Sequence, residues 1–456
     1  MIIEKIKSEG LAHLSYLIGD GGKAAVIDPR RDCQCYIDTA RARGLEITHV
    51  FETHRNEDLI SGARILSERT GAQVYHGPNP DQPISFAKTV REGECVPIGG
   101  DLTISVLETP GHTDDSLSFV VNDKSYVDGA VGVFTGDALF VGDVGRTDFY
   151  PDRAAEVAGL LFDSLRKLLA LGDQTIIYPA HGAGSVCGSG MASREFSTIG
   201  HERRNNPKLA ITDRDAFIAA KLAETHYVPP YFRTMERLNI EGGSAMSRTK
   251  IPRPLSLKEL EEADVDRVVD IRSVTAFAGA HLPGSLALPV SMIPAFAGWF
   301  LDEKQKLALV ADDMAQTEEA VSHLGRIGFD HVVGAVTGMP GLAAKGTSFA
   351  AIPMIDAATV AERLSRADPD WTLLDVRAID EVEKEPMEGA LHVYIGHLRD
   401  RYRELRGDAP MTVMCASGAR ATVAAGWLAA HGFTKLDIFL GSMGAWKAYH
   451  SPNISR

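Results

Sequence analysis

The order of apolar and polar residues predicts short strands that alternate with helices along most of the chain. Early apolar runs at Leu14–Ile18, Ala24–Ile27 and Ile47–Phe51 have the length and composition of buried strands. Between them, Cys35–Arg43 has helical character and ends at Gly44, a residue typical of helix C-termini. We therefore expect a mixed sheet with covering helices and not a helical bundle.

Four polar clusters directly follow predicted strands in the first half of the chain. They contain His54, His112, Asp137 and His181 in that order, each placed within a few residues of an apolar run. A single histidine after a strand is usually structural. Four such clusters in one protein favour a common metal-binding or catalytic site at the strand ends.

The residues around these four positions form motifs that resemble a known family. The segments are T-P-G-H-T (109–113), F-T-G-D-A-L-F (134–140), G-R-T-D-F (145–149) and P-A-H-G-A-G-S (179–185). They are similar to the persulfide dioxygenases of the metallo-β-lactamase superfamily. The resemblance implies an αββα sandwich with one Fe(II) per N-terminal domain, held by His54, His112 and Asp137. Zinc is the alternative metal.

The first cluster departs from the pattern of that superfamily, H-x-H-x-D-H. Here the loop is His54-Arg-Asn-Glu-Asp-Leu, so Asn56 and Leu59 stand where two further histidines are expected. A two-zinc hydrolase would lack ligands for its second metal, whereas two imidazoles and one carboxylate suit a mononuclear non-haem iron. Changes next to metal ligands typically cost about 10–100-fold in affinity or activity. The loop therefore weakens the hydrolase hypothesis more than the dioxygenase hypothesis.

Four further residues are candidates with a structural alternative each. Asp58 and His181 are either groups beside the metal and substrate or residues that fix their loops by hydrogen bonds. Arg146 either stabilises its loop or faces an anionic substrate. Cys187, on a glycine-rich loop six residues after His181, is either a small buried thiol or an acceptor of sulfane sulfur near the iron.

The second half of the chain contains an internal duplication. Val268–Arg272 recurs 105 residues later as Leu373–Arg377, and Gly328-Phe329 recurs as Gly432-Phe433. A period of this length indicates two related domains and not a solenoid. Both copies resemble the rhodanese sulfurtransferase domain, which implies open parallel sheets with helices on both faces.

The two copies differ in chemistry. In the second copy, a predicted strand at Met411–Met414 leads into Cys415-Ala-Ser-Gly-Ala-Arg420 and then a helix. This loop is similar to the active loop of rhodaneses, where backbone N–H groups and a helix N-terminus favour a thiolate. Cys415 would carry sulfane sulfur, and Arg420 would contact an anionic substrate or lock the loop. The first copy has Asp312-Asp313 and no cysteine at its corresponding loop, so we expect it to be a spacer, docking or dimerisation element.

Composition sets the remaining limits. The 456 residues predict about three domains, which we place at 1–245, 252–350 and 353–456, with a linker near 241–254. The net charge of −14 argues against nucleic acid or an anionic membrane as a partner. Five scattered cysteines, and neither a signal peptide nor an apolar run long enough to span a bilayer, favour a cytoplasmic protein.

Together, the two resemblances imply an iron persulfide dioxygenase fused to a rhodanese, active in sulfide detoxification. Its small-molecule partners would be persulfide thiols such as glutathione persulfide, O2, and sulfite or thiosulfate. We also predict a homo-oligomer, either a dimer or a tetramer. Two alternatives stay open: a zinc thioester hydrolase of the glyoxalase II type, and a sulfur carrier whose N-terminal domain binds no metal.

Overall fold

The chain folds into two compact units. The computed structural model describes residues 1–79, 82–126, 129–185, 187–188, 190–246, 252–366 and 368–451. The first unit comprises Met1–Arg248 with Gly325–Gly328, and the second comprises Thr249–Leu324 with Phe329–Arg456. The three predicted domain limits stay predictions, and residues 247–251 of the predicted linker lie outside the described part.

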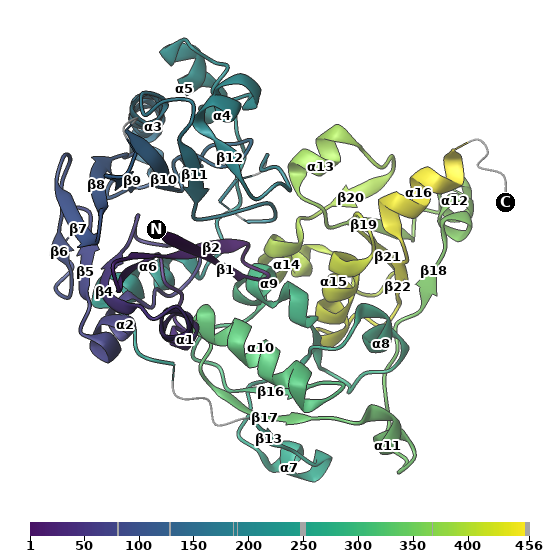
Figure 1. The fold of residues 1–456 in the computed structure, drawn as a ribbon. Helices are drawn as coiled ribbons and strands as arrows, with labels where there is room; N and C mark the ends of the chain where they lie inside the picture. The colour runs from purple at the N-terminus through teal and green to yellow at the C-terminus, as the bar shows by residue number, and fades with distance from the viewer. Residues whose placement is uncertain are drawn as a thin grey trace. The chain divides into compact units, whose positions relative to one another are not determined.

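Two six-stranded sheets face each other in the first unit (Figure 1). The first sheet has the order β1 (Ile2–Ser8), β2 (His13–Asp20), β3 (Lys23–Ile27), β4 (Glu46–Phe51), β5 (Gln73–His76) and β6 (Lys88–Thr89). The second has the order β12 (Ser197–Thr198), β11 (Ile176–Pro179), β10 (Ala130–Gly136), β9 (Leu117–Asp123), β8 (Leu102–Glu108) and β7 (Cys95–Gly99). Alternate strand residues meet between the sheets: the rings of Tyr16 and Phe134 lie 5.2 Å apart, and those of Phe51 and Phe119 lie 4.9 Å apart.

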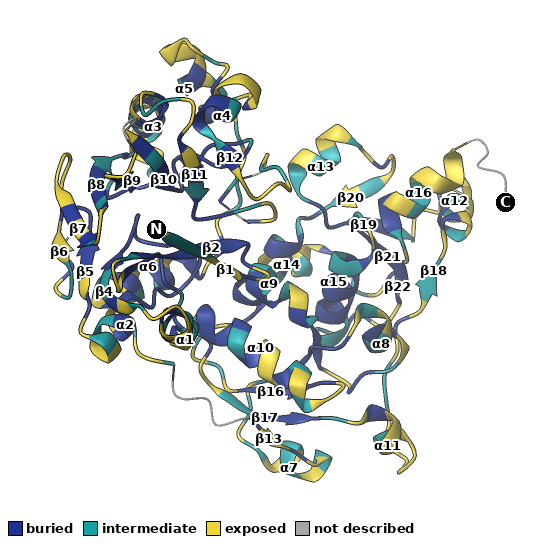
Figure 2. Cartoon of the chain, viewed as in Figure 1, coloured by how far each residue is buried: buried dark blue, intermediate teal, exposed yellow. Residues whose placement is uncertain are grey.

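Helices cover the outer face of each sheet. On the first sheet these are α1 (Gln34–Ala42) and α2 (Ala63–Thr70), whose Tyr36 and Leu66 pack with Val26 and Val50. The second sheet is covered by α3 (Ala154–Leu169), α4 (Ile199–Asn205) and α5 (Arg214–Leu222). A last helix, α6 (Phe232–Glu241), completes this unit. The four layers, helix–sheet–sheet–helix, confirm the predicted fold class, and the buried strand residues between them are visible in Figure 2.

The second unit contains two five-stranded parallel sheets with the same strand order. One sheet has the order β13 (Arg253–Pro254), β17 (Val332–Val336), β16 (Leu307–Val310), β14 (Arg267–Asp270) and β15 (Leu286–Ala287). The other has the order β18 (Met354–Ile355), β22 (Leu436–Phe439), β21 (Met411–Met414), β19 (Thr372–Asp375) and β20 (Ala390–His392). The duplication that the sequence predicts is therefore a duplication of topology, and the open parallel sheets are confirmed.

The helices of the second unit follow the same duplication. The first copy has α7 (Leu257–Glu262), α8 (Val274–Gly279), α9 (Ile293–Phe300), α10 (Met314–Arg326) and α11 (Met339–Ala343). The second copy has α12 (Ala357–Arg366), α13 (Ile379–Lys384), α14 (Leu398–Arg401), α15 (Ala419–Ala430) and α16 (Ser442–His450). Short 3-10 segments occur at Pro151–Arg153, Val290–Met292, Ile395–His397 and Tyr402–Glu404. Within the described ranges, no helix has both the length and the hydrophobicity needed to cross a membrane.

Candidate metal centre and cysteine loop

The four polar clusters that follow strands in the sequence come together in the first unit. His54 follows β4, His112 follows β8, Asp137 follows β10 and His181 follows β11. All four side chains are buried, with at most 2% of each residue exposed. The edge where these strands end therefore carries a closely packed group of imidazoles and carboxylates.

Hydrogen bonds fix the orientation of two imidazoles in this group. His54 Nδ1 donates to Thr53 Oγ1 at 2.9 Å, because that hydroxyl donates its own hydrogen to Asp28 Oδ2 at 2.9 Å. His112 Nδ1 donates to the carbonyl of Arg146 at 3.0 Å. Because Nδ1 is the hydrogen-bonded nitrogen in both rings, Nε2 is the atom that each imidazole, in its neutral form, would offer to a metal.

The two Nε2 atoms face the same carboxylate. Asp137 Oδ2 lies 3.9 Å from His54 Nε2 and 3.5 Å from His112 Nε2. Neither Nε2 atom makes a hydrogen bond of good geometry, although both are buried. Buried polar atoms without such a bond are costly, and a cation beside Asp137 would satisfy both Nε2 atoms. These residues therefore fit a single divalent transition metal.

A fourth side chain, Glu57, lies in the same group. Its Oε1 is 3.0 Å from His112 Nε2 and its Oε2 is 3.8 Å from His54 Nε2, with 1% of the residue exposed. Burial raises the pKa of Glu57, but His112 outweighs burial and lowers it to about 2. Burial likewise lowers the pKa of His112, but Glu57 raises it to about 9. Glu57 could not be predicted from the sequence pattern, because it occupies a variable position of H-x-H-x-D-H.

His181 links two carboxylates behind the metal group. Its Nδ1 lies 2.8 Å from Asp137 Oδ1, and its Nε2 lies 2.9 Å from Asp58 Oδ2. Burial lowers the pKa of His181, but Asp137 and Asp58 raise it well above its usual value. His181 and Asp58 are therefore placed to hold Asp137 in position.

Cys187 is buried next to both groups. Its thiol donates to Glu57 Oε1 at 3.4 Å, and its sulfur lies within 4.8 Å of ligand-type atoms of Asp58 and His181. Burial raises the pKa of the Cys187 thiol well above its usual value. The structure thus places this cysteine at the centre, in an environment that favours the thiol over the thiolate.

Arg146 is bound within its own loop. Its Nε and Nη2 donate to Asp148 at 2.7 and 2.6 Å, its Nη1 donates to the carbonyl of Tyr227, and its guanidinium lies over the ring of Phe149. Because its carbonyl also orients His112, these contacts favour the loop-stabilising role over contact with an anionic substrate.

The loop that carries His54 is anchored by helix α6. Asn239 Nδ2 donates to the carbonyls of Asn56 and Leu59 at 2.6 and 2.8 Å, and Asn239 Oδ1 accepts from the backbone N–H of Ser61. The Tyr231 hydroxyl donates to the carbonyl of Asp58 at 3.4 Å. Asn239 was not predicted, since a lone polar residue on an amphipathic helix gives no sign of such a role.

The second unit holds the other predicted centre, the loop after β21. Cys415 is buried, and its sulfur accepts from the backbone N–H of Gly418 at 3.1 Å and from the Ser442 hydroxyl at 3.9 Å. Gly418 has a φ of 105°, in the left-handed region that favours glycine, and helix α15 begins at the next residue. The backbone N–H of Gly418 and the N-terminus of helix α15 therefore lie next to the sulfur of Cys415.

Arg420, in the first turn of helix α15, is paired with the carboxylate of Glu381 in helix α13. Its Nη1 and Nη2 donate to Glu381 Oε2 and Oε1 at 2.5 and 2.7 Å. Burial raises the pKa of Glu381, but Arg420 outweighs burial and lowers it. This two-point contact favours the loop-locking role of Arg420 over direct contact with substrate.

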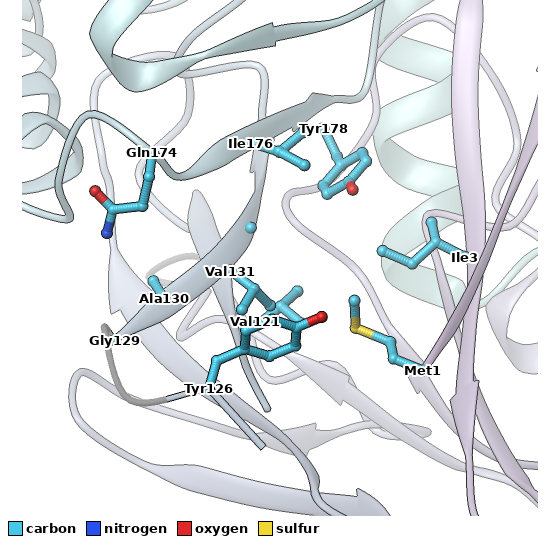
Figure 3. A pocket seen from close by; sticks show the side chains of 11 residues that line it. Met1, Ile3, Val121, Tyr126, Gly129, Ala130, Val131, Gln174, Ile176 and Tyr178 are labelled. Atoms are coloured by element: carbon cyan, nitrogen blue, oxygen red, sulfur yellow. The ribbon is translucent and has the colours of Figure 1, made fainter. Parts of the chain in front are cut away.

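A separate apolar cavity of about 340 Å³ lies at the other end of the second sheet (Figure 3). Its walls come mainly from Ile3, Val121, Val131, Ile176 and Tyr178. Gln174 is the polar side chain among its lining residues apart from the tyrosine hydroxyls. The cavity therefore lacks the imidazoles and carboxylates that chemistry at the metal centre requires.

Known protein families match two parts of the chain. Residues 9–181 match the Metallo-beta-lactamase superfamily, and residues 356–449 match the Rhodanese-like domain. Hydroxyacylglutathione hydrolase GloC of Haemophilus influenzae is 30% identical over 231 residues, which cover 46% of this chain and 98% of that protein. The chain belongs to the metallo-beta-lactamase superfamily.

Two further similar proteins are a persulfide dioxygenase and a metallo-beta-lactamase of known structure. The mitochondrial persulfide dioxygenase ETHE1 of Mus musculus is 30% identical over 211 residues, which cover 43% of this chain and 72% of that protein. A solved metallo-beta-lactamase from Staphylococcus aureus is 29% identical, with a TM-score of 0.67, and covers 74% of this chain and 99% of that one. The metallo-beta-lactamase and rhodanese-like domains are thus shown, while the named relatives include both a hydrolase and a dioxygenase.

Proposed function

We propose that this chain oxidises a low-molecular-weight persulfide, such as glutathione persulfide, with O2 at a mononuclear Fe(II) centre. The observation that carries the proposal is the convergence of His54 Nε2, His112 Nε2 and Asp137 Oδ2 in a buried group. Asn56 and Leu59 remove two histidines from the second-metal side of this group. The similarity to a persulfide dioxygenase supports the same reaction.

The overall reaction takes a persulfide, O2 and water to a thiol, sulfite and two protons. A bound iron would supply the O2 chemistry, which none of the protein side chains can perform. Thr53 and the Arg146 carbonyl hold the two imidazoles in the required orientation. Phe149 stands edge-on to His112 with ring centres 5.2 Å apart, so that an apolar side chain limits water beside the metal.

We place a second reaction at Cys415. Its thiolate attacks the outer sulfur of a persulfide, the S–S bond breaks, and the thiol leaves with the electron pair and takes up a proton. Sulfite then attacks the outer sulfur on Cys415, which forms thiosulfate and restores the thiolate; the reverse sequence uses thiosulfate. Gly418 N–H and helix α15 stabilise the negative sulfur in each step.

Oxygen uptake by protein purified without oxygen and loaded with iron tests the proposal directly. With glutathione persulfide, wild type should consume O2 and release sulfite, and His112→Ala should not. Cys415→Ser should keep oxygen uptake but lose thiosulfate formation. If iron-loaded wild type consumes no oxygen with this substrate, the dioxygenase proposal is wrong.

One observation favours a second candidate, a zinc hydrolase of glutathione thioesters. Ligand-type atoms of Asp58, His181 and Cys187 lie within 4.8 Å of one another and could hold a second metal beside the first. The Haemophilus hydrolase is similar over the same domain. Metal analysis separates the candidates, because the dioxygenase predicts one iron per chain, the hydrolase predicts two zinc ions, and a sulfur carrier predicts none.

A further inference from the structure

Glu57 is the one carboxylate of the metal group that the proposed function does not use. We infer that Glu57 is a fourth protein ligand, so that the centre consists of two imidazoles and two carboxylates. This inference rests on the proposed metal site and adds a ligand to it. The geometry that carries it is the position of the Glu57 carboxylate across the two free Nε2 atoms, 3.0 Å from His112 and 3.8 Å from His54.

Burial supports a ligand role for this carboxylate. Glu57 Oε2 is buried and has no hydrogen-bond partner, whereas Oε1 lies 3.0 Å from His112 Nε2 and accepts a weak bond from the Cys187 thiol. Ionised carboxylates are rarely buried unless they are paired or bind a metal. Asp137 brings a second carboxylate into the same space. A divalent cation would compensate both charges and would also satisfy the two Nε2 atoms.

The loop presents Glu57 in a fixed position. Asn239 holds the carbonyls of Asn56 and Leu59 on either side of it, so the carboxylate is directed inward by a bound backbone and not by a free turn. His54 and Glu57 therefore reach the centre from one anchored loop. Glu57 would thus supply one additional ligand from this loop, in which Asn56 and Leu59 stand where the superfamily pattern has two histidines.

A fourth ligand changes what the centre can bind. Two carboxylates balance the charge of a divalent ion, and this harder ligand set suits Fe(II), Mn(II) or Co(II). A six-coordinate metal would keep two open positions instead of three. Two open positions would still accommodate one persulfide and one oxygen molecule.

Binding of Co(II) to the full-length protein tests the ligand role without any substrate. The visible absorption of Co(II) reports its coordination, and competition with a chelator gives the dissociation constant. We expect Glu57→Gln to weaken Co(II) binding at least about 10-fold and to change the spectrum. Glu52→Gln is the matched control, because Glu52 is a buried carboxylate of the same loop that does not contact the centre; it should bind as wild type does.

Unchanged affinity and spectrum in Glu57→Gln would overturn the inference, as would wild type that binds no Co(II). If Glu57→Gln does not fold, Glu57→Asp, which keeps a shorter carboxylate, replaces it and should give an intermediate affinity. The experiment is independent of persulfide oxidation. Wild type that binds Co(II) through Glu57 but consumes no oxygen would refute the proposed function and leave the ligand assignment standing.

Discussion

The orientation of the His54 imidazole depends on the hydroxyl of the neighbouring residue, Thr53. Thr53 accepts the Nδ1 hydrogen of His54 and donates to Asp28, so it fixes both the tautomer and the ring orientation. We expect Thr53→Val, which keeps the shape and removes the hydroxyl, to weaken Fe(II) binding about 10–100-fold in an anaerobic chelator competition. Thr48→Val is the control, since its hydroxyl bonds the Ala24 carbonyl away from the site. Equal affinities in both variants would contradict this role.

Arg420 acts on Cys415 chemistry through the loop. Lysine keeps the charge but cannot make the two-point contact with Glu381. We therefore expect Arg420→Lys to lower kcat for thiosulfate sulfur transfer while KM stays near the wild-type value, and to reduce unfolding free energy by about 1–3 kcal/mol. Steady-state kinetics over a thiosulfate series separates the two interpretations, because a large rise in KM with unchanged kcat would assign Arg420 to substrate binding.

Candidate ligands that directly follow strands can be predicted from the sequence, whereas the residues that hold them in place cannot. His54, His112 and Asp137 could be predicted because each comes directly after an apolar run. Glu57 could not, since acidic residues in loops are usually solvated, and only the fold shows that this one is buried. Asn239 lies 180 residues from Leu59, and its hydrogen bond to the Leu59 carbonyl depends entirely on tertiary packing.

Helix α15 connects the cysteine loop to the copy that lacks a cysteine. A Cβ atom at Gly426 would lie 3.0 Å from Phe277 Cζ and 3.1 Å from Ala287 Cβ, both in the first copy. The first copy therefore packs directly on the helix that begins after the Cys415 loop. This contact gives the cysteine-less domain a physical role that does not require chemistry of its own.

A larger side chain at this contact should disturb sulfur transfer. We expect Gly426→Leu to cost about 1–3 kcal/mol of unfolding free energy through overpacking, and to lower thiosulfate sulfurtransferase activity. Ala430→Leu, at the half-buried end of the same helix, should change both quantities much less. Denaturant unfolding and a sulfurtransferase assay measure the effects. Full activity in Gly426→Leu would show that the contact does not position the loop.

The positions of strands could be predicted from the sequence where apolar runs have clear ends. The partners against which the helices pack could not. The predicted strand at Met411–Met414 agrees with β21 residue for residue, and the apolar run Leu307–Val310 forms β16. Each is a short apolar run followed at once by a loop or turn. By contrast, every residue from Ala421 to Leu428 in α15 is buried, so the sequence has no polar face to indicate which side contacts the first copy.

The proposed metal centre and the proposed thiol chemistry belong to different compact units. His54, His112, Asp137 and Glu57 belong to the first unit, whereas Cys415 belongs to the second. A ligand stabilises only the part of a protein whose unfolding releases it, by about 2.7 kcal/mol at a free concentration of 100 times its dissociation constant. Metal removal should therefore act on one unit.

Scanning calorimetry of the full chain can test this separation. We expect two unfolding transitions for the iron-loaded protein under anaerobic conditions, and a lower Tm for only one of them after chelation. His112→Ala should show the lower Tm with or without iron, because it removes a ligand of the centre. Cys415→Ser should respond to chelation as wild type does, since its sulfur has no part in metal binding. A chelator that shifts both transitions equally would mean that the two units unfold as one cooperative structure.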